Sequence, residues 1–328
     1  MQTKRLVYID LAKGVCMLLI VVGHTGLKIS IPGLSCALVP LYFALSGYFF
    51  KRNNSFRELL LRKTNTLIIP FLFFYITAYL VFYLIKWINP SLLVTDAHGI
   101  MDLFNNRQFF NGPIWFLLAL FWCNIFSYGI VKHINNIIIQ LFTICTIGFI
   151  GWYLGFCKLF VPLFLDVAMT CMPFFAMGFL INKYNIIESK KYCNYYDVFF
   201  IGIWVANIII EHKMHQRLSL HYNIVEGWST YLLSFSSILC LLYICKKIQY
   251  LPILNYIGRF SLIILCVHHM IYRPLALFLN HFSILQMGGV TEALLTVLLS
   301  MACVPLLSKF FPRFVAQKDC ITIKKKDY

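Results

Sequence analysis

Charged side chains are scarce in this sequence: Asp, Glu, Lys and Arg make up 12% of its 328 residues, whereas 60% are hydrophobic. A soluble globular domain usually has about a quarter of its residues charged. No stretch is long and polar enough to form a separate soluble domain. Apolar runs of about twenty residues recur instead up to residue 308, and this length is typical of a transmembrane helix.

Cysteine motifs are missing as well. The twelve cysteines show neither the spacing of a metal site nor that of a disulfide framework. Many lie within apolar runs, where cysteine behaves as a small apolar residue. We therefore predict that the protein binds no metal.

Acidic residues are few, with 12 Asp and Glu against 28 Lys and Arg, which gives a net charge of +16. The basic residues do not form a face interleaved with aromatics, as a nucleic-acid-binding module would. They lie in short loops between the apolar runs, where the positive-inside rule of membrane proteins explains them. We therefore expect no nucleic-acid partner, and we expect contact with anionic membrane lipid instead.

The apolar runs predict an all-α integral membrane protein with about ten transmembrane helices. Ten spans place both termini on one side of the membrane. If that side is the cytoplasm, 20 Lys and Arg residues face it and 7 face outward, so both termini are predicted to be cytoplasmic. Residues 1–310 would form a single transmembrane domain, and residues 311–328 a basic cytoplasmic tail. The predicted helices are 6–27, 32–50, 66–88, 113–131, 137–156, 160–181, 197–211, 229–245, 259–279 and 286–308.

The first span carries three titratable side chains, Asp10, Lys13 and His24. An uncompensated charge at the bilayer centre costs at least about 2.5–3.5 kcal/mol, so such groups face the bundle interior. Asp10 and Lys13 are three residues apart, and Lys13 and His24 are eleven apart, which puts all three on one helical face. Either Asp10 and Lys13 form a structural ion pair, or the stripe lines a cavity. His24 is the natural general base, because an imidazole exchanges a proton near neutral pH.

The ninth span contains a second intramembrane histidine, His268. Ser261 lies seven residues before it and hence on nearly the same face, whereas His269 and Arg273 pair at i, i+4 on another face. A histidine this deep in a span favours a functional role.

The densest basic cluster before the tail is the predicted inner loop from Lys51 to Lys63, which includes Arg57, Arg62 and Lys63. Topology alone explains such a cluster, but clustered cations also bind the phosphates of an anionic cofactor arriving from the cytosol. Ser46 and Gly47 precede this segment in an aromatic-rich span, where small residues permit close helix packing.

Two outer segments, 89–112 and 212–228, are polar. They are either solvated loops or contacts for a hydrophilic substrate. The first ends in a turn followed by Trp115, at the depth of an interfacial aromatic belt. Their polar residues include Asp96, His98, Asp102, Arg107, His212, His215, His221 and Glu226.

Several stretches, taken in order, resemble acyltransferase family 3, a family of integral membrane acyltransferases, and especially its fucose 4-O-acetylase-like branch. The first span resembles the opening of that family, in which a basic residue, here Lys13, is followed after ten residues by a histidine, here His24. Four further stretches are similar to family elements in the same order: "PLYFALSGYFF", "GPIWFL", "MPFFAMGFLI" and "YIGRFSLIILCVHHMI". The last aligns His268 with the family histidine.

The resemblance implies transfer of an acetyl or similar small acyl group from cytosolic acetyl-CoA to a hydroxyl of a cell-surface saccharide or its glycolipid precursor. The location implied is the plasma membrane, specifically the bacterial cytoplasmic membrane. On this reading His24, Lys13, Asp10 and His268 are catalytic. Acetyl-CoA would be the acyl donor, and a saccharide or glycolipid would be the acceptor. The donor-binding candidates are Arg62, Lys63, Arg57 and Ser46, and the acceptor-binding candidates are Trp115 and Ser261.

Two other interpretations remain open at this point. Intramembrane His and Asp residues also serve as proton relays, so the second interpretation is a polysaccharide exporter or transporter. Many transporters show internal repeats, and no convincing repeat is present here. A catalytically inactive partner in a polysaccharide machine is the third interpretation. The sequence carries no signal of oligomeric state.

Overall fold

A computed structural model describes residues 5–25, 27, 29, 31–51, 55–88, 90, 97–105, 107–187, 194–214, 218–281 and 288–322. These residues form an all-α fold with one two-stranded antiparallel sheet, β1 (Leu218–Ser219) and β2 (Ile224–Val225). The long helices are α1 (Val7–His24), α4 (Ile69–Ile88), α6 (Trp115–His133), α7 (Ile137–Phe156), α8 (Leu165–Lys183), α9 (Asn194–Met214), α10 (Ser229–Ile248), α12 (Ser261–His281) and α13 (Gly288–Phe310). The short elements are η1 (Ser35–Ala37), α2 (Pro40–Tyr48), α3 (Phe56–Lys63), η2 (Thr64–Ile68), α5 (Asp102–Asn105), η4 (Gly112–Ile114), η5 (Pro162–Phe164), η6 (Leu220–Tyr222) and α11 (Pro252–Arg259).

Seven helical stretches within the described residues are long and apolar enough to cross a membrane. An eighth would be formed by α11 and α12 together, which meet at an 88° bend. The predicted span 32–50 contains only the nine-residue α2 after η1. At 1.5 Å per residue α2 measures about 14 Å, which is less than half of the roughly 30 Å hydrocarbon layer. The multi-pass membrane architecture is confirmed, whereas the count of ten crossings and the cytoplasmic position of both termini stay predictions.

The basic segment before α4 is helical, although the sequence predicted a loop there. Ser55 caps α3, and its hydroxyl accepts a hydrogen bond from the backbone N–H of Glu58 at 3.2 Å. This Ser-x-x-Glu pattern is half of a capping box, which starts a helix. The helix then continues through the π-helical turn η2 into α4, so that one helical stretch covers Phe56–Ile88. The positive charges of α3 are therefore held on a rigid element.

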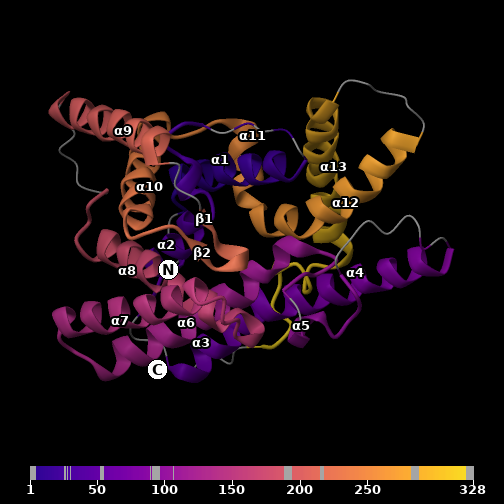
Figure 1. Cartoon of the computed structure of the whole chain (residues 1–328), viewed down its shortest axis with the longest axis horizontal. Coiled ribbons are helices and arrows are strands. Elements are labelled where there is room, and N and C mark those ends of the chain that lie inside the picture. The colour runs from indigo at the N-terminus through magenta and orange to yellow at the C-terminus, as the bar shows by residue number, and fades with distance from the viewer. Residues whose placement is uncertain are drawn as a thin grey trace.

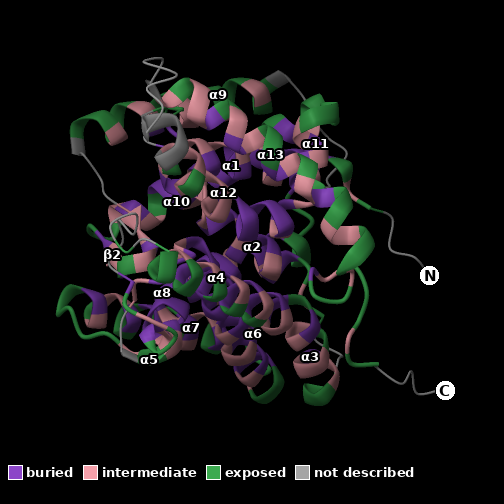
Figure 2. Ribbon diagram, turned by 90° about the vertical axis from the view of Figure 1, so that its right-hand side faces the viewer, coloured by how far each residue is buried: buried purple, intermediate pink, exposed green. Residues whose placement is uncertain are grey.

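The first helix, α1, lies at the centre of the molecule (Figure 1) and contacts α2, α10, α11, α12 and α13. Buried side chains gather on α1 and α2, whereas α9 at the periphery is mostly exposed (Figure 2). The large apolar side chains exposed on peripheral helices such as α7 and α13 are those expected to face lipid. Asp10 and Lys13 of α1 are thus half-buried within the bundle, whereas His24 at its end is exposed.

Glycines allow close helix contacts around α1 and α2, and two of them illustrate this. A Cβ atom on Gly258 of α11 would lie 1.7 Å from the carbonyl oxygen of Asp10, and one on Gly47 of α2 would lie 1.9 Å from that of Phe175 on α8. Both positions therefore require glycine. Packing through small residues is the usual way in which membrane helices approach each other closely, and it fixes α1 against α11.

The segment after α13 is held against η2 and α4. The Asn65 side chain accepts hydrogen bonds from the backbone N–H groups of Cys320 (3.2 Å) and Ile321 (2.9 Å), and it donates one to the Ile321 carbonyl (2.9 Å). Phe314 stacks on Phe73 of α4, with ring centres 5.0 Å apart. Residues 311–322 of the predicted tail are therefore part of the packed structure.

Candidate active site

Asp10 lies between two cations at the start of α1. One carboxylate oxygen is 2.5 Å from Nε of Arg5, and the other is 3.8 Å from Nζ of Lys13. The ion pair predicted from the i, i+3 spacing of Asp10 and Lys13 is therefore present. Lys13 also lines a cavity, whereas Asp10 is not among the described residues that line it. Two interpretations of the stripe were open, a structural ion pair and the lining of a cavity. Asp10 takes part only in the ion pair, whereas Lys13 takes part in the ion pair and also lines the cavity.

Two cavities share lining residues near the end of α1, and we call them the inner and the outer cavity after the predicted topology, in which that end of α1 faces outward. The inner cavity has a volume of about 230 Å³ and is lined by Lys13, Tyr42, Ser261, Trp115 and His24, together with apolar side chains. The outer cavity has a volume of about 510 Å³, and its lining includes His24, Trp115, His221, His269 and Arg273. Among the described residues, His24 and Trp115 are the only polar side chains that line both cavities.

The His24 ring is oriented by its own helix. Its Nδ1 is 2.7 Å from the carbonyl oxygen of Ile20. A carbonyl only accepts hydrogen bonds, so Nδ1 must carry the proton and Nε2 of the neutral ring carries the lone pair. The side chain is exposed, and it lines both cavities. His24 therefore presents a basic nitrogen at the junction of the two cavities.

Three imidazoles form a cluster at this junction. The ring centre of His24 lies 5.1 Å from that of His268 and 5.8 Å from that of His269. His268, the residue singled out in the sequence, is completely buried and lines neither cavity, whereas the neighbouring His269 lines the outer one. Nδ1 of His268 donates to the Ile264 carbonyl at 3.0 Å, and its buried Nε2 has no hydrogen-bond partner within the described part of the chain.

The predicted acceptor-binding residues both line the inner cavity. Ser261 begins α12 directly after the 88° bend and is 6% exposed. Trp115 begins α6 after the Gly112–Ile114 turn η4. That turn is tied to α12, because the Asn111 amide donates to the carbonyl of Cys266 at 2.8 Å. The turn and the bend together place an indole and a hydroxyl near the histidine cluster.

The predicted donor-binding residues separate into two groups. Arg57 and Arg62 are exposed on α3. Lys63 instead turns inward, with its Nζ 3.5 Å from the Ser46 hydroxyl, and Ser46 in turn contacts the buried Asn124 amide at 3.0–3.1 Å. Neither Lys63 nor Ser46 is among the described residues that line the two cavities.

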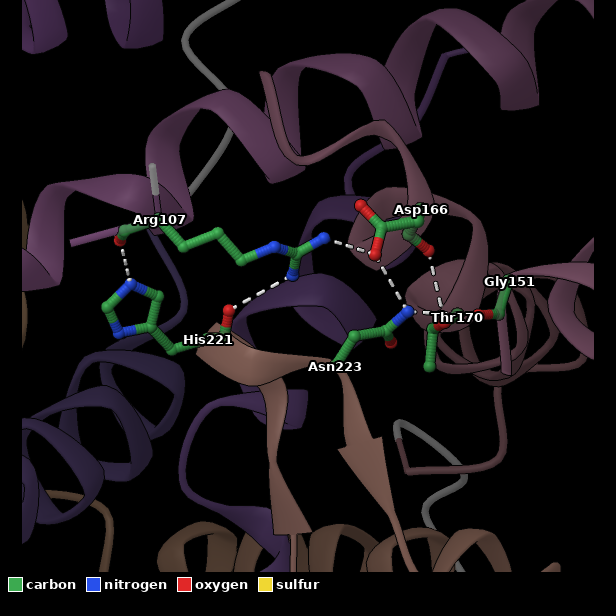
Figure 3. A network of polar contacts seen from close by, with 6 residues as sticks. All are labelled: Arg107, Gly151, Asp166, Thr170, His221 and Asn223. Atoms are coloured by element: carbon green, nitrogen blue, oxygen red, sulfur yellow. Dashed lines mark hydrogen bonds and ion pairs between the residues drawn. The ribbon is translucent and has the colours of Figure 1, made fainter. Parts of the chain in front are cut away.

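A buried polar network holds the outer side of the site in place, and sequence reasoning missed it (Figure 3). Arg107 forms an ion pair with the fully buried Asp166 of α8, which also accepts a hydrogen bond from the Asn223 amide at 2.9 Å. Arg107 and His221 exchange further bonds through each other's backbone carbonyls, at 3.2 and 2.6 Å. From the sequence, Arg107 and His221 were named only as polar residues of the outer segments, and neither of them was paired with Asp166.

This network positions the ring of His221 against the site. The ring lies parallel to the Trp115 indole, with an interplanar angle of 3° and ring centres 5.7 Å apart. Burial lowers the pKa of His221 to about 4, and the positive charge of Arg107 acts in the same direction, while the hydrogen bond to the Arg107 carbonyl opposes them. The ring is therefore neutral at physiological pH, donates from Nε2 to that carbonyl, and buttresses Trp115.

Among the other polar residues of the two outer segments, one has a structural role and two fall outside the described part. Asp102 is buried and accepts hydrogen bonds from the Tyr79 hydroxyl at 2.6 Å and from the backbone N–H of His98 at 2.8 Å. Asp96 and His215 lie outside the described residues. No group of three or more His, Cys, Asp or Glu side chains within the described part has the arrangement of a metal site.

Comparison with known protein families identifies the family of the chain. The family model described as "Acyltransferase domain", that of acyltransferase family 3, matches residues 6–309. The match does not single out the fucose 4-O-acetylase-like branch, which stays a prediction. No curated protein and no solved structure matches the chain. Because the matched region covers almost the whole chain, including every helix described above, the chain belongs to acyltransferase family 3 and is a multi-pass membrane acyltransferase.

Proposed function

We propose that the protein transfers an acetyl or similar small acyl group from cytosolic acetyl-CoA to a hydroxyl of a cell-surface saccharide or its lipid-linked precursor. The observation that carries this proposal is the position of His24 Nε2. The nitrogen belongs to a ring whose tautomer is fixed by the Ile20 carbonyl, at the point where the inner and outer cavities meet. A donor from one side of the membrane and an acceptor from the other would reach the same base there.

The inner cavity suits the acyl end of the donor. Its lining is mainly apolar, with Lys13 as the one formally charged side chain among the described residues. A volume of about 230 Å³ accommodates an acyl thioester and part of its arm, but not a nucleotide. The phosphates of acetyl-CoA would remain at the cytoplasmic surface, where Arg57 and Arg62 are exposed on α3.

Lys13 is assigned to the donor and not to the reacting carbonyl. Eleven residues of α-helix separate it from His24, a rise of about 16 Å. A group at that distance cannot contact the atom on which His24 acts. Lys13 would instead bind the polar arm of the thioester, and its ion pair with Asp10 (3.8 Å) supports this position on the cavity wall.

The proposed reaction transfers the acyl group directly from the thioester to the acceptor hydroxyl. Nε2 of His24 takes the proton of the acceptor hydroxyl, and the oxygen forms a C–O bond to the thioester carbonyl. The C–S bond then breaks, and the proton passes from His24 to the leaving thiolate to give free CoA. The indole N–H of Trp115, the second polar group at the junction, is the candidate donor to the developing oxyanion. Initial transfer of the acyl group to His24 would use the same geometry.

The test is the replacement of His24 by glutamine, which keeps a polar side chain of similar length but removes the base. Purified wild-type and variant proteins are compared by release of the CoA thiol, and surface saccharides of expressing cells are compared by mass spectrometry. We expect the variant to lose about 10²–10⁴-fold in rate. His133→Ala is the matched control, because His133 is exposed at the end of α6 and lines neither cavity. Normal acylation by a stably folded His24→Gln protein would remove the proposed role.

A further inference from the structure

Arg273 is the only formally charged side chain among the described residues that line the outer cavity. The same wall contains three imidazoles, those of His24, His221 and His269, and no described Asp or Glu. A cleft that is lined by charge of one sign and has low-dielectric walls attracts ligands of the opposite sign. The described wall of this cavity therefore favours an anion.

The position of Arg273 is that of a binding residue. It lies in α12, within the part of the bent span that covers Ser261–Ala276. Charged side chains in such spans face cavities and mark the path of a substrate. The guanidinium carbon lies 5.4 Å from the centre of the Phe110 ring, and Phe110 is followed by Asn111, which is hydrogen-bonded to α12. The aromatic ring thus supports the head group at the cavity wall.

Arg107 provides a contrast on the same side of the molecule. Its guanidinium forms an ion pair with Asp166 and a hydrogen bond with the His221 carbonyl, so it holds the hairpin of β1 and β2, residues 218–225, which we call the outer hairpin. Arg107 lines a separate surface pocket next to Phe160 and does not line the outer cavity.

Helical spacing puts Arg273 near the histidine cluster. Arg273 follows His269 by four residues, so it lies one turn, about 6 Å, further along α12. The ring of His269 lies 5.8 Å from that of His24. A group bound at Arg273 would therefore belong to the sugar that presents its hydroxyl to His24, or to the bond next to it.

We propose that the outer cavity binds an acceptor with a negatively charged group, a carboxylate or a phosphate, seated against Arg273 while a neighbouring hydroxyl faces His24. This inference rests on the proposed acyltransferase function and specifies its acceptor. An arginine binds either group through two parallel N–H···O bonds, which fixes the orientation of the ligand as well as its charge. The carboxylate would come from an acidic sugar, and the phosphate from the linkage to a lipid carrier.

The experiment uses the full-length protein in lipid nanodiscs with acetyl-CoA and three acceptor probes: glucose, glucuronate and glucose 1-phosphate. The readouts are kcat/KM from CoA thiol release and ligand-induced change in Tm. We expect the wild type to prefer one or both charged probes over glucose. Preference for glucuronate alone identifies an acidic sugar, and preference for glucose 1-phosphate alone identifies a phosphate-linked acceptor.

The variant Arg273→Gln should lose at least about tenfold in kcat/KM for the preferred charged probe, without loss for glucose. Arg273→Lys should retain an intermediate preference, because it keeps the charge but not the two-bond geometry. Lys86→Gln is the control, because it removes an exposed cation at the end of α4 that does not line the cavity.

The proposal is overturned if the wild type shows no preference for either charged probe, or if Arg273→Gln leaves that preference intact. Failure of the acyltransferase function gives a different result. In that case no probe would release CoA above the background of His24→Gln, but the charged probes would still raise Tm in the wild type and not in Arg273→Gln.

Discussion

The imidazole of His24 lies edge-on to the completely buried imidazole of His268, with ring centres 5.1 Å apart and planes at 63°. Each ring donates its Nδ1 proton to a carbonyl four residues earlier on its own helix, Ile20 and Ile264 respectively. Both Nε2 atoms of the neutral rings therefore carry lone pairs. Only that of His24 belongs to a ring that lines the cavities, so His24 can contact substrates and His268 can act only through His24.

We predict that His268→Phe lowers kcat about 10- to 100-fold and leaves KM for both substrates nearly unchanged. Phenylalanine fills a similar space, but it removes the lone pair beside the positive charge that forms on His24 during proton transfer. Steady-state kinetics of CoA release would show this change, with Tm measured to verify packing. An unchanged kcat would restrict His268 to a packing role.

A second prediction concerns the close contact between α1 and α11. In Gly258→Ala the new Cβ would meet the Asp10 carbonyl oxygen at 1.7 Å, so the two helices must separate. We expect a loss of about 1–3 kcal/mol in the free energy of unfolding and reduced activity, because Lys13 and His24 move with α1. The measurement is thermal unfolding in detergent together with CoA release.

Gly129→Ala in α6 is the matched control for this substitution. A Cβ at Gly129 meets no atom within 4 Å, and alanine is favoured over glycine within a helix by roughly 1 kcal/mol. This variant should be as stable as the wild type or more so. Equal effects of the two substitutions would contradict the role assigned to Gly258.

The features that sequence predicted well depend on local helical geometry. The Asp10–Lys13 pair and the inward position of His24 follow from spacings within one helix, and the structure reproduces them. The capping pattern of Ser55 and Glu58 was equally local, although the segment was predicted to be a loop.

The choice between His268 and His269 does not depend on local helical geometry alone. Successive helical residues point about 100° apart, so the one that reaches the cavity depends on how α12 is rotated and where it begins. The 88° bend before Ser261 decides this, and it depends on packing against other helices. The contact between Arg107 and Asp166 joins residues 59 positions apart, and no periodicity in one sequence pairs such residues.

A third prediction is that the outer hairpin loosens in acid. The pKa of His221 is lowered to about 4 in the folded protein, against an ordinary value of 6.5. The unfolded hairpin therefore binds more protons than the folded one between these values, so stability is complete above about pH 6.5 and falls as the pH drops towards 4. The full effect is on the order of 3 kcal/mol, at about 1.4 kcal/mol for each pKa unit.

Hydrogen exchange of the backbone amides of residues 218–225 is the measurement for the hairpin. We expect their protection to fall between pH 6.5 and 4.5 after correction for intrinsic exchange rates, while the amides of α6 keep theirs. In His221→Gln, which has no titratable ring, protection should not change over the same range. A pH-independent wild type would show that proton binding at His221 is not linked to hairpin opening.

The buried ion pair of Arg107 and Asp166 gives the fourth prediction. Asp166→Asn leaves the guanidinium without its counter-charge, and removal of one partner from a buried pair typically costs about 3–5 kcal/mol. The double variant Arg107→Met, Asp166→Leu removes both charges and should recover a large part of that loss, because no uncompensated charge remains. Stability is measured as Tm and as denaturant midpoint in one detergent.

The same variants separate stability from function at the outer cavity. In the double variant His221 loses the hydrogen bond that its carbonyl accepts from Arg107, but it keeps the one that its ring donates to the Arg107 backbone carbonyl. Stacking on Trp115 should then persist, and KM for the acceptor should rise less than in Asp166→Asn. If the double variant is as unstable as the single one, the Asn223 bond to the Asp166 carboxylate, and not the charge pair, holds the hairpin on α8.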